Sequence, residues 1–129
     1  MSYRFSAMLH IPGDVRDAIA FYERAFGATT GWSTPPAAEM VAQLLVQGAE
    51  FWVHPADEAI GNPPPQPSGT AVRLMLIVGD PDAVFDQAVA AGAVVRSPMQ
   101  DHDYGWRDGS VLDPFGHRWE IGKPLSAQG

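Results

Sequence analysis

The sequence offers few groupings of side chains that could perform catalysis. His102 lies between Asp101 and Asp103 and could serve as a general base, although three polar residues in one loop are usually just solvated. There is no Gly-rich phosphate loop, no Gly-x-Ser-x-Gly elbow and no His-Glu-x-x-His pair. The chain has no cysteine, which excludes disulfides and thiolate metal sites and makes a reducing, cytoplasmic location the expectation.

The charge balance restricts the partners. A formal net charge of −7 argues against nucleic acid, which needs a basic face, and is compatible with small cationic or neutral ligands. No signal segment is evident at the N-terminus and no apolar window reaches the length of a membrane span, so we expect no membrane partner. The 46% hydrophobic and 18% charged residues are typical of a globular chain.

An internal repeat organises the chain, and it aligns on two Gly-Asp pairs at residues 13–14 and 79–80. An alanine-rich amphipathic stretch follows each pair, with an aspartate placed to cap a helix and a later glycine suited to end it, Gly27 or Gly92. Each predicted helix buries one stripe of residues spaced by three and four. These stripes are Ile19, Tyr22 and Phe26 in the first helix and Val84, Ala88 and Ala91 in the second.

Short apolar strand candidates surround both helices. They cover residues 5–11, 28–32, 40–47 and 50–54 in the first half, and 72–78, 94–99, 106–113 and 117–122 in the second. Each half is therefore a βαβββ module. The modules span about residues 3–60 and 70–124 of a single domain, 1–129, and the proline-rich stretch 61–69 connects them.

The predicted fold is α+β. One module cannot bury both faces of a four-stranded sheet by itself. We therefore expect the two modules to pair edge to edge in a curved, mixed, eight-stranded sheet, with the helices outside. Its concave side would form a cavity for a small-molecule ligand.

Two segments resemble the glyoxalase, bleomycin-resistance and extradiol-dioxygenase (vicinal oxygen chelate) superfamily, most closely its PhnB-like branch. AIAFYERAFGA at residues 18–28 is similar to the first helix of the family, and YGWRDGSVLDPFGHRWE at 104–120 is close to the final hairpin of that branch. The resemblance implies a homodimer. It leaves the function open, because lyases, isomerases, dioxygenases, thiol transferases and pure binders share this scaffold.

The resemblance also implies four metal-ligand positions, one pair from each module, usually histidine or glutamate on the first and last strands. Glu120 fills one of them well. Aligning the Gly-Asp pairs puts Ala7 and Arg73 at two others, and the fourth falls on Trp52, or on His54 if the register slips by one same-face step. Alanine has no donor atom and arginine repels a cation, so we expect no cofactor and disfavour a divalent metal.

The other histidines are not obvious ligands. His10 follows Ala7 by three residues, which predicts that it lies on the opposite face of its strand, toward the helices. His117 has opposite parity to Glu120, and His102 lies in the acidic loop. We expect each to be a surface or hydrogen-bonded structural residue.

Arg73 and Glu120 should both point into the cavity. A guanidinium–carboxylate pair would cancel two otherwise costly charges, and we predict that this pair replaces the metal. In an enzyme, the catalytic residues would be Glu120 as general base and Arg73 as electrostatic stabiliser.

Further residues are candidates for ligand contact. Tryptophan and tyrosine offer rigid stacking area, and binders of this superfamily that sequester flat cationic antibiotics look similar in using it. Arg118 shares the face of Glu120 and could meet an acid group, whereas Trp119 should pack against the helices. The candidate ligand-binding residues are Trp52, His54, Tyr104, Trp106 and Arg118, with Trp32 at the cavity wall or mouth.

Three functions stay open. We favour a metal-free protein that binds a small organic molecule, including sequestration of a toxic or antibiotic compound. The second is a lyase or isomerase of the same superfamily. The third is a metal-dependent dioxygenase or lyase with Glu120 as a ligand, which the missing ligand positions make the least favoured.

Overall fold

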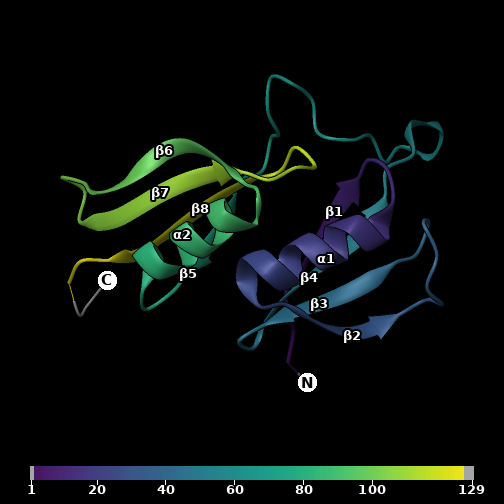
Figure 1. Ribbon diagram of the computed structural model, residues 1–129, viewed down its shortest axis with the longest axis horizontal. Helices are drawn as coiled ribbons and strands as arrows, with labels where there is room; N and C mark the ends of the chain where they lie inside the picture. Colours follow the sequence, from purple (N-terminus) through teal and green to yellow (C-terminus); the bar gives the residue numbers. More distant parts are fainter. Residues whose placement is uncertain (1, 127–129) are drawn as a thin grey trace. The chain divides into compact units, whose positions relative to one another are not determined.

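Two copies of one βαβββ module follow each other along the chain in this computed structural model, which describes residues 2–126 (Figure 1). The first copy consists of β1 (Ala7–Ile11), α1 (Val15–Phe26), β2 (Thr29–Ser33), β3 (Ala42–Val46) and β4 (Ala49–Pro55). After the 3-10 helix η1 (Glu58–Ile60), the second consists of β5 (Leu74–Ile77), α2 (Pro81–Ala91), β6 (Val94–Asp101), β7 (Trp106–Leu112) and β8 (Arg118–Pro124). The α+β class and the tandem modules are confirmed.

The chain divides into two compact units between Pro64 and Pro65, inside the predicted connector. Each unit contains one four-stranded sheet, in the order β1-β4-β3-β2 or β5-β8-β7-β6. The first strand of each module runs parallel to the last one, and the other neighbours are antiparallel. The joining of these sheets into one curved surface around a cavity stays a prediction.

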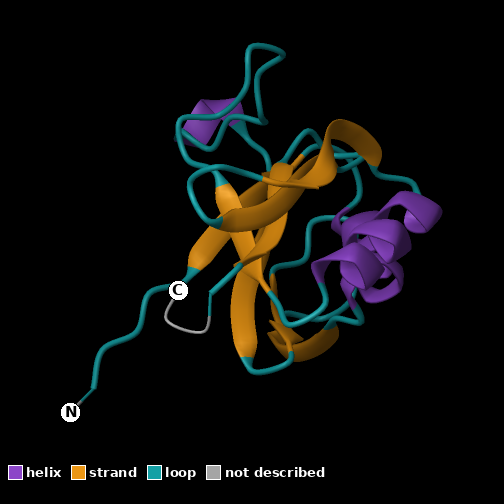
Figure 2. Ribbon diagram, turned by 90° about the vertical axis from the view of Figure 1, so that its left-hand side faces the viewer, coloured by secondary structure: helices purple, strands orange, loops and turns teal. Residues whose placement is uncertain are grey.

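The helix ends follow the predicted capping chemistry. The side chain of Asp14 accepts a hydrogen bond from the Arg16 amide, and that of Asp80 accepts one from the Ala83 amide. Helix α1 ends where Gly27 adopts a left-handed φ of 70°, which glycine tolerates without steric cost. In each unit the α-helix packs on one face of its own sheet, and no α-helix among the described residues of that unit covers the other face (Figure 2).

The buried stripe of α1 is largely as predicted, whereas in α2 only Ala88 of the predicted stripe is fully buried. Tyr22 is fully buried, and its ring meets Phe51 of β4 at a centroid distance of 5.1 Å. In α2 the large buried residue is Phe85, 8% exposed, rather than the predicted Val84. The reason lies on β7, where Gly109 leaves room for the ring: a Cβ there would lie 2.9 Å from Phe85.

Two strands begin later than the apolar runs predict. Phe5 and Val72 precede β1 and β5 and are exposed, Phe5 completely and Val72 at 73%.

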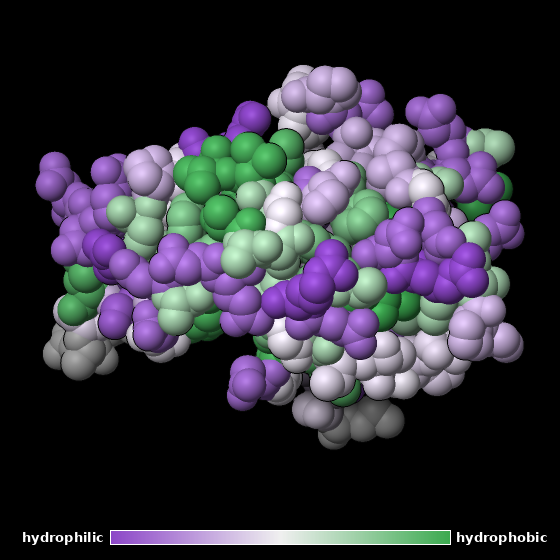
Figure 3. All heavy atoms as spheres, viewed as in Figure 1, coloured by the Kyte–Doolittle hydropathy of each residue, from purple (hydrophilic) through white to green (hydrophobic). Residues whose placement is uncertain are grey.

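Hydrophilic side chains cover much of the face seen in Figure 3, with apolar groups gathered on the unit that carries β6. No helix of the described residues is long and apolar enough to cross a membrane.

A buried carboxylate fixes the hairpin between β7 and β8. Asp113 is 3% exposed and accepts hydrogen bonds from the amides of Phe115 and His117. It also accepts one from the indole Nε1 of Trp119 at 2.9 Å. The turn and the first buried side chain of β8 are thus held by one group, which sets the side on which each β8 residue lies.

Asp113→Ala should lower the free energy of unfolding by roughly 2 to 4 kcal/mol, because it leaves a buried indole N–H and a buried amide without an acceptor. Urea unfolding followed by tryptophan fluorescence measures the change. Asp103→Ala, in an exposed loop, is the control and should change stability by less than about 0.5 kcal/mol. Equal effects of the two substitutions would contradict the role of Asp113.

Candidate functional site

The face of the second sheet that α2 leaves uncovered carries alternating polar residues. Trp119 and Ile121 of β8 are buried, as predicted for Trp119, so Arg118 and Glu120 lie on the opposite face. In the β7–β8 register Ser110 is the partner of Glu120. We call this surface the polar face: Asp108 and Ser110 of β7, Arg118 and Glu120 of β8, and Arg73, which immediately precedes β5.

The expected ion pair between Arg73 and Glu120 is present. Arg73 Nη1 lies 2.6 Å from Glu120 Oε1. The Glu120 side chain is 15% exposed and that of Arg73 63%, so the arginine reaches over the carboxylate from the solvent side. Beside this pair, Arg118 Nη2 donates a hydrogen bond of 3.1 Å to Ser110 Oγ. Three of the predicted site residues therefore meet on one surface.

A second cluster, not foreseen from the sequence, lies at the β6–β7 turn. The hydroxyl of Tyr104 donates to Asp108 Oδ2 at 3.0 Å, and His102 stacks on the Tyr104 ring at 4.7 Å. His102 Nε2 lies 2.9 Å from Asp108 Oδ1, an ion pair when the ring is protonated, but the contact is not aligned as a hydrogen bond. Asp108 thus brings a histidine and a tyrosine together.

Asp101, which precedes His102, is engaged elsewhere. Arg107 bridges Asp82 at the start of α2 and Asp101 on β6, with distances of 2.8 and 3.0 Å. These two ion pairs of Arg107 connect helix α2 to the β6–β7 hairpin. The pairing of His102 with Asp108 was missed because the β6–β7 register shifts between Ser97 and Gln100, which residue counting does not reveal.

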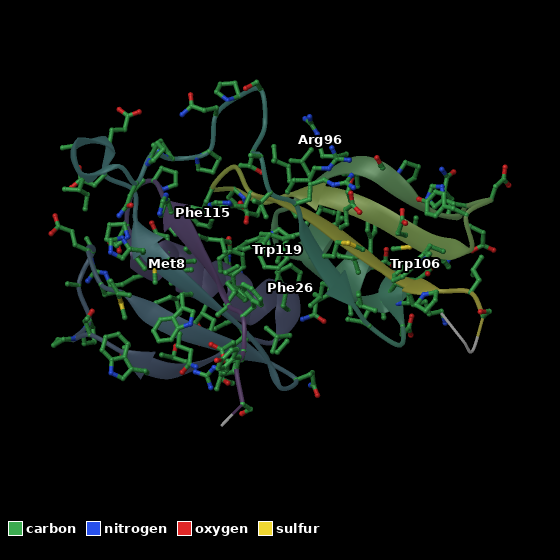
Figure 4. The ribbon with its side chains drawn as sticks, turned by 180° about the vertical axis from the view of Figure 1, so that it is seen from behind. Met8, Phe26, Arg96, Trp106, Phe115 and Trp119 are labelled. Carbon is green, nitrogen blue, oxygen red and sulfur yellow. The ribbon has the colours of Figure 1, made fainter. Side chains whose placement is uncertain are left out.

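Trp106 lies at the other end of the sheet from Arg96, as the labelled side chains in Figure 4 show. It is half-buried and pairs with Pro124, beyond the Tyr104 turn. Tyr104 and Trp106 therefore supply aromatic area beside the polar face, while Arg96 and Arg118 lie toward its opposite end.

In the first unit, the uncovered face carries Trp52 and His54. Trp52 meets Trp32 of β2 at a ring distance of 5.8 Å, and its indole Nε1 donates to Glu50 at 3.0 Å. Partial burial favours the neutral form of Glu50, but hydrogen bonds, first from Trp52 and then from Gln43, outweigh it and lower the Glu50 pKa. Glu50 is therefore a charged group beside the predicted stacking surface.

His10 lies on the same face as His54, so the predicted orientation toward the helices is wrong. His10 pairs with His54 in the β1–β4 register, and their ring centroids are 6.4 Å apart. Leu9 and Ile11, 3% and 1% exposed, take the helix-facing positions instead. Ala7 has their parity and pairs with Phe51, which packs on α1, so Ala7 is not an open-face position.

The error comes from aligning the two modules on their Gly-Asp pairs. The same number of residues joins strand and helix in both, yet Ile11 is buried and Ile77 is 60% exposed. Gly13 has a φ of 84°, whereas Gly79 has no positive φ, so the two connections turn differently. Connections of equal length between strand and helix therefore do not place the corresponding strand residues on the same face of the two sheets.

The donor set does not fit a divalent metal. Within residues 2–126, no three histidine, aspartate or glutamate side chains gather around a point that could hold an ion. Glu120, the best ligand by resemblance, is already neutralised by Arg73, and a second cation, Arg118, lies on the same face. A metal there would have to displace one guanidinium beside another.

The comparisons with known proteins agree with this fold. The model of the Glyoxalase/Bleomycin resistance protein/Dioxygenase superfamily matches residues 5–121, and the chain belongs to that superfamily. The uncharacterized protein Mb0911c of Mycobacterium bovis is 36% identical over 118 residues, which cover 87% of this chain and 78% of that protein.

Two solved structures are similar over nearly the whole chain. TioX from Micromonospora sp. ML1 has a TM-score of 0.72 and 27% identity, with 96% of this chain and 100% of that chain covered. The At5g48480 gene product of Arabidopsis thaliana has a TM-score of 0.75 and 28% identity, with coverage of 95% and 100%. The superfamily resemblance is thus confirmed, and the PhnB-like branch stays a prediction.

Tyr104 should titrate above the range of a free tyrosine. Partial desolvation of its hydroxyl, then the hydrogen bond to the Asp108 carboxylate, raise the Tyr104 pKa. The folded state holds the hydroxyl proton of Tyr104 more tightly than the unfolded state does. Protonated Tyr104 therefore stabilises the folded state, and this stabilisation is lost as pH rises through the raised pKa. The near-ultraviolet absorbance difference between the protein and Tyr104→Phe measures this titration. Asp108→Asn should lower the pKa and Asp103→Asn should not; an unchanged pKa in Asp108→Asn would refute the cause.

Proposed function

We propose that this protein binds a small organic molecule on the polar face of the second unit without a metal ion. The observation that carries the proposal is the 2.6 Å ion pair of Arg73 and Glu120. An enzyme that chelates a metal needs a carboxylate free to ligate, whereas here the carboxylate holds a guanidinium.

Stability does not account for this pair. Ion pairs with a solvent-exposed partner contribute little to the free energy of folding, about 0 to 1 kcal/mol, and Arg73 is 63% exposed. The pair nevertheless keeps a half-buried carboxylate and a guanidinium in fixed positions on an open surface. Such an arrangement is suited to orient the polar groups of a ligand.

Aromatic side chains supply the apolar part of the site. Tyr104 and Trp106 lie beside the polar face, and Trp52 with Trp32 offers a further stacking surface in the first unit, next to His54. Flat ligands gain stacking energy on such rings. Sequestration of a toxic or antibiotic compound is the biological role that we propose for this binding.

A lyase or isomerase is the second candidate, favoured by the His102–Asp108–Tyr104 cluster. The charges of Glu120 and Arg73 both act on the Tyr104 hydroxyl, so the cluster and the ion pair share one environment. In that reaction Glu120 would be the general base, and Arg73 would stabilise developing negative charge. A dioxygenase with Glu120 as metal ligand is disfavoured, because Glu120 is paired with Arg73 and no three possible ligand side chains gather among residues 2–126.

We further propose a PhnB-like homodimer located in the cytoplasm. Met75 and Ile77 of the edge strand β5 are 54% and 60% exposed, and such edges are commonly covered by a partner. Sedimentation of the purified protein tests the dimer.

Purified protein should contain well below one divalent ion per chain, and a chelator should leave its melting temperature unchanged. A tightly bound ion would add its binding free energy to the folded state, so its removal would lower the melting temperature. Mass spectrometry of the metals together with a thermal scan measures both quantities. Stoichiometric manganese, iron, nickel or zinc whose removal destabilises the protein would refute the metal-free proposal.

A thermal-shift screen of cationic antibiotics, aldehydes and glutathione adducts should give at least one compound that raises the melting temperature. Glu120→Gln should weaken its binding by about tenfold or more, because a charged hydrogen-bond partner is lost. Glu23→Gln, on the exposed face of α1, removes the same charge elsewhere and should bind as the parent does.

Chromatography of the bound compound separates the two candidates. An unchanged compound supports binding alone, and a converted one supports the lyase or isomerase. Affinity that is equal in Glu120→Gln and the parent would place the ligand away from the polar face and contradict the proposal.

A further inference from the structure

A cavity of about 370 Å³ lies within the second unit, beside the polar face. The segment 65–70 forms one wall, and side chains from the sheet and the β7–β8 turn form the other. The arginine and leucine side chains of this second wall are Arg73, Arg96, Leu112 and Arg118. Figure 4 shows Arg96 at this end of the sheet.

The charge of this cavity opposes that of the whole protein. The chain carries 15 acidic residues and only 8 lysines and arginines, yet three arginines line this one cavity and no acidic residue does. Unshielded like charges repel each other, so their convergence costs free energy unless a negative group offsets it. Glu120 offsets only part of this positive charge, through its ion pair with Nη1 of Arg73.

Two of the three guanidinium groups have unused donors. Arg118 Nε is buried and has no hydrogen-bond partner in the described part of the chain, although its Nη2 is held by Ser110. Arg96 has no carboxylate within ion-pair distance among residues 2–126. A buried N–H without an acceptor is rare in folded proteins and commonly marks the place of a missing partner.

We propose that this cavity binds an oxyanion, a carboxylate or phosphate group of the ligand. Guanidinium groups form paired, charge-assisted hydrogen bonds with such groups, and the hydroxyls of Ser68 and Thr70 lie in the same lining. The inference rests on the proposed function: the acid group enters the cavity while the body of the ligand lies on the polar face, toward Tyr104. It narrows the ligand from any small organic molecule to an anionic one.

Two local features favour an oxyanion over an apolar group. The apolar side chains in the lining are few, chiefly Leu112 and the prolines of segment 65–70, so burial alone gives little affinity. Arg118 is held in place by Ser110, so its remaining donors are already oriented when a ligand arrives.

Titration with inorganic phosphate, and separately with acetate, tests the proposal. The readout is the Nε–H signals of the arginines in nitrogen-15 NMR, at an ionic strength held constant with chloride. We expect the Arg118 and Arg96 signals to shift saturably with one or both anions. The anion that binds more tightly then identifies the group as a phosphate or a carboxylate.

Arg96→Met should weaken the binding of that anion by about tenfold, because a charged donor is lost. Arg96 is exposed, so the variant should fold as the parent does. Arg24→Met, on the exposed surface of α1, removes the same charge outside the cavity and should leave the binding unchanged.

Shifts that do not saturate, or equal weakening in Arg96→Met and Arg24→Met, would overturn the proposal. A ligand from the thermal-shift screen that lacks an acid group and is not displaced by phosphate or acetate would also overturn it, while the proposed function stands. Conversely, saturable anion binding in a protein that binds no organic compound supports the cavity and refutes the proposed function.

Discussion

The orientation of the β8 side chains depends on one buried carboxylate. Asp113 holds the amides of the β7–β8 turn and the indole of Trp119 at once, so Trp119 enters the core under α2. Because neighbouring residues of a strand alternate between faces, Arg118 and Glu120 must then point away from the helix. A shift of one residue would bury two charges and expose the tryptophan, and the cost of that exchange secures the register.

The polar face follows from this register together with the place where β5 begins. Arg73 lies just before β5, outside the hydrogen-bonded ladder, so its long side chain can fold back over Glu120. Since the arginine is mostly exposed, its attraction to Glu120 contributes little to stability. In the proposed function, the pair holds a carboxylate and a guanidinium in position for the polar groups of a ligand.

Much of the architecture could be predicted because it rests on local rules. Capping by Asp14 and Asp80 marked both helices, and alternation along β8 placed Trp119 and Glu120 on opposite faces. The pairing of Arg73 with Glu120 followed once both were assigned to one face. These inferences needed only parity within a strand and the order of the elements.

What could not be predicted depends on geometry between elements. His10 was misplaced because two connections of equal length turn differently at Gly13 and Gly79. The contact of His102 with Asp108 depends on irregular β6–β7 pairing, and the burial of Phe85 depends on the missing side chain of Gly109. None of these leaves a periodic signal in the sequence.

The charges on the second unit favour an anionic ligand over a metal ion. A cation bound at Glu120 would lie beside Arg73 and Arg118, and would have to break the 2.6 Å ion pair to reach its ligand. An oxyanion would meet three guanidinium groups, one of which has a buried donor without an acceptor among residues 2–126, and would leave the ion pair intact. In the proposed binding mode the anion gains hydrogen bonds where a metal would have to break an ion pair, and this difference is the physical reason for proposing an anionic ligand.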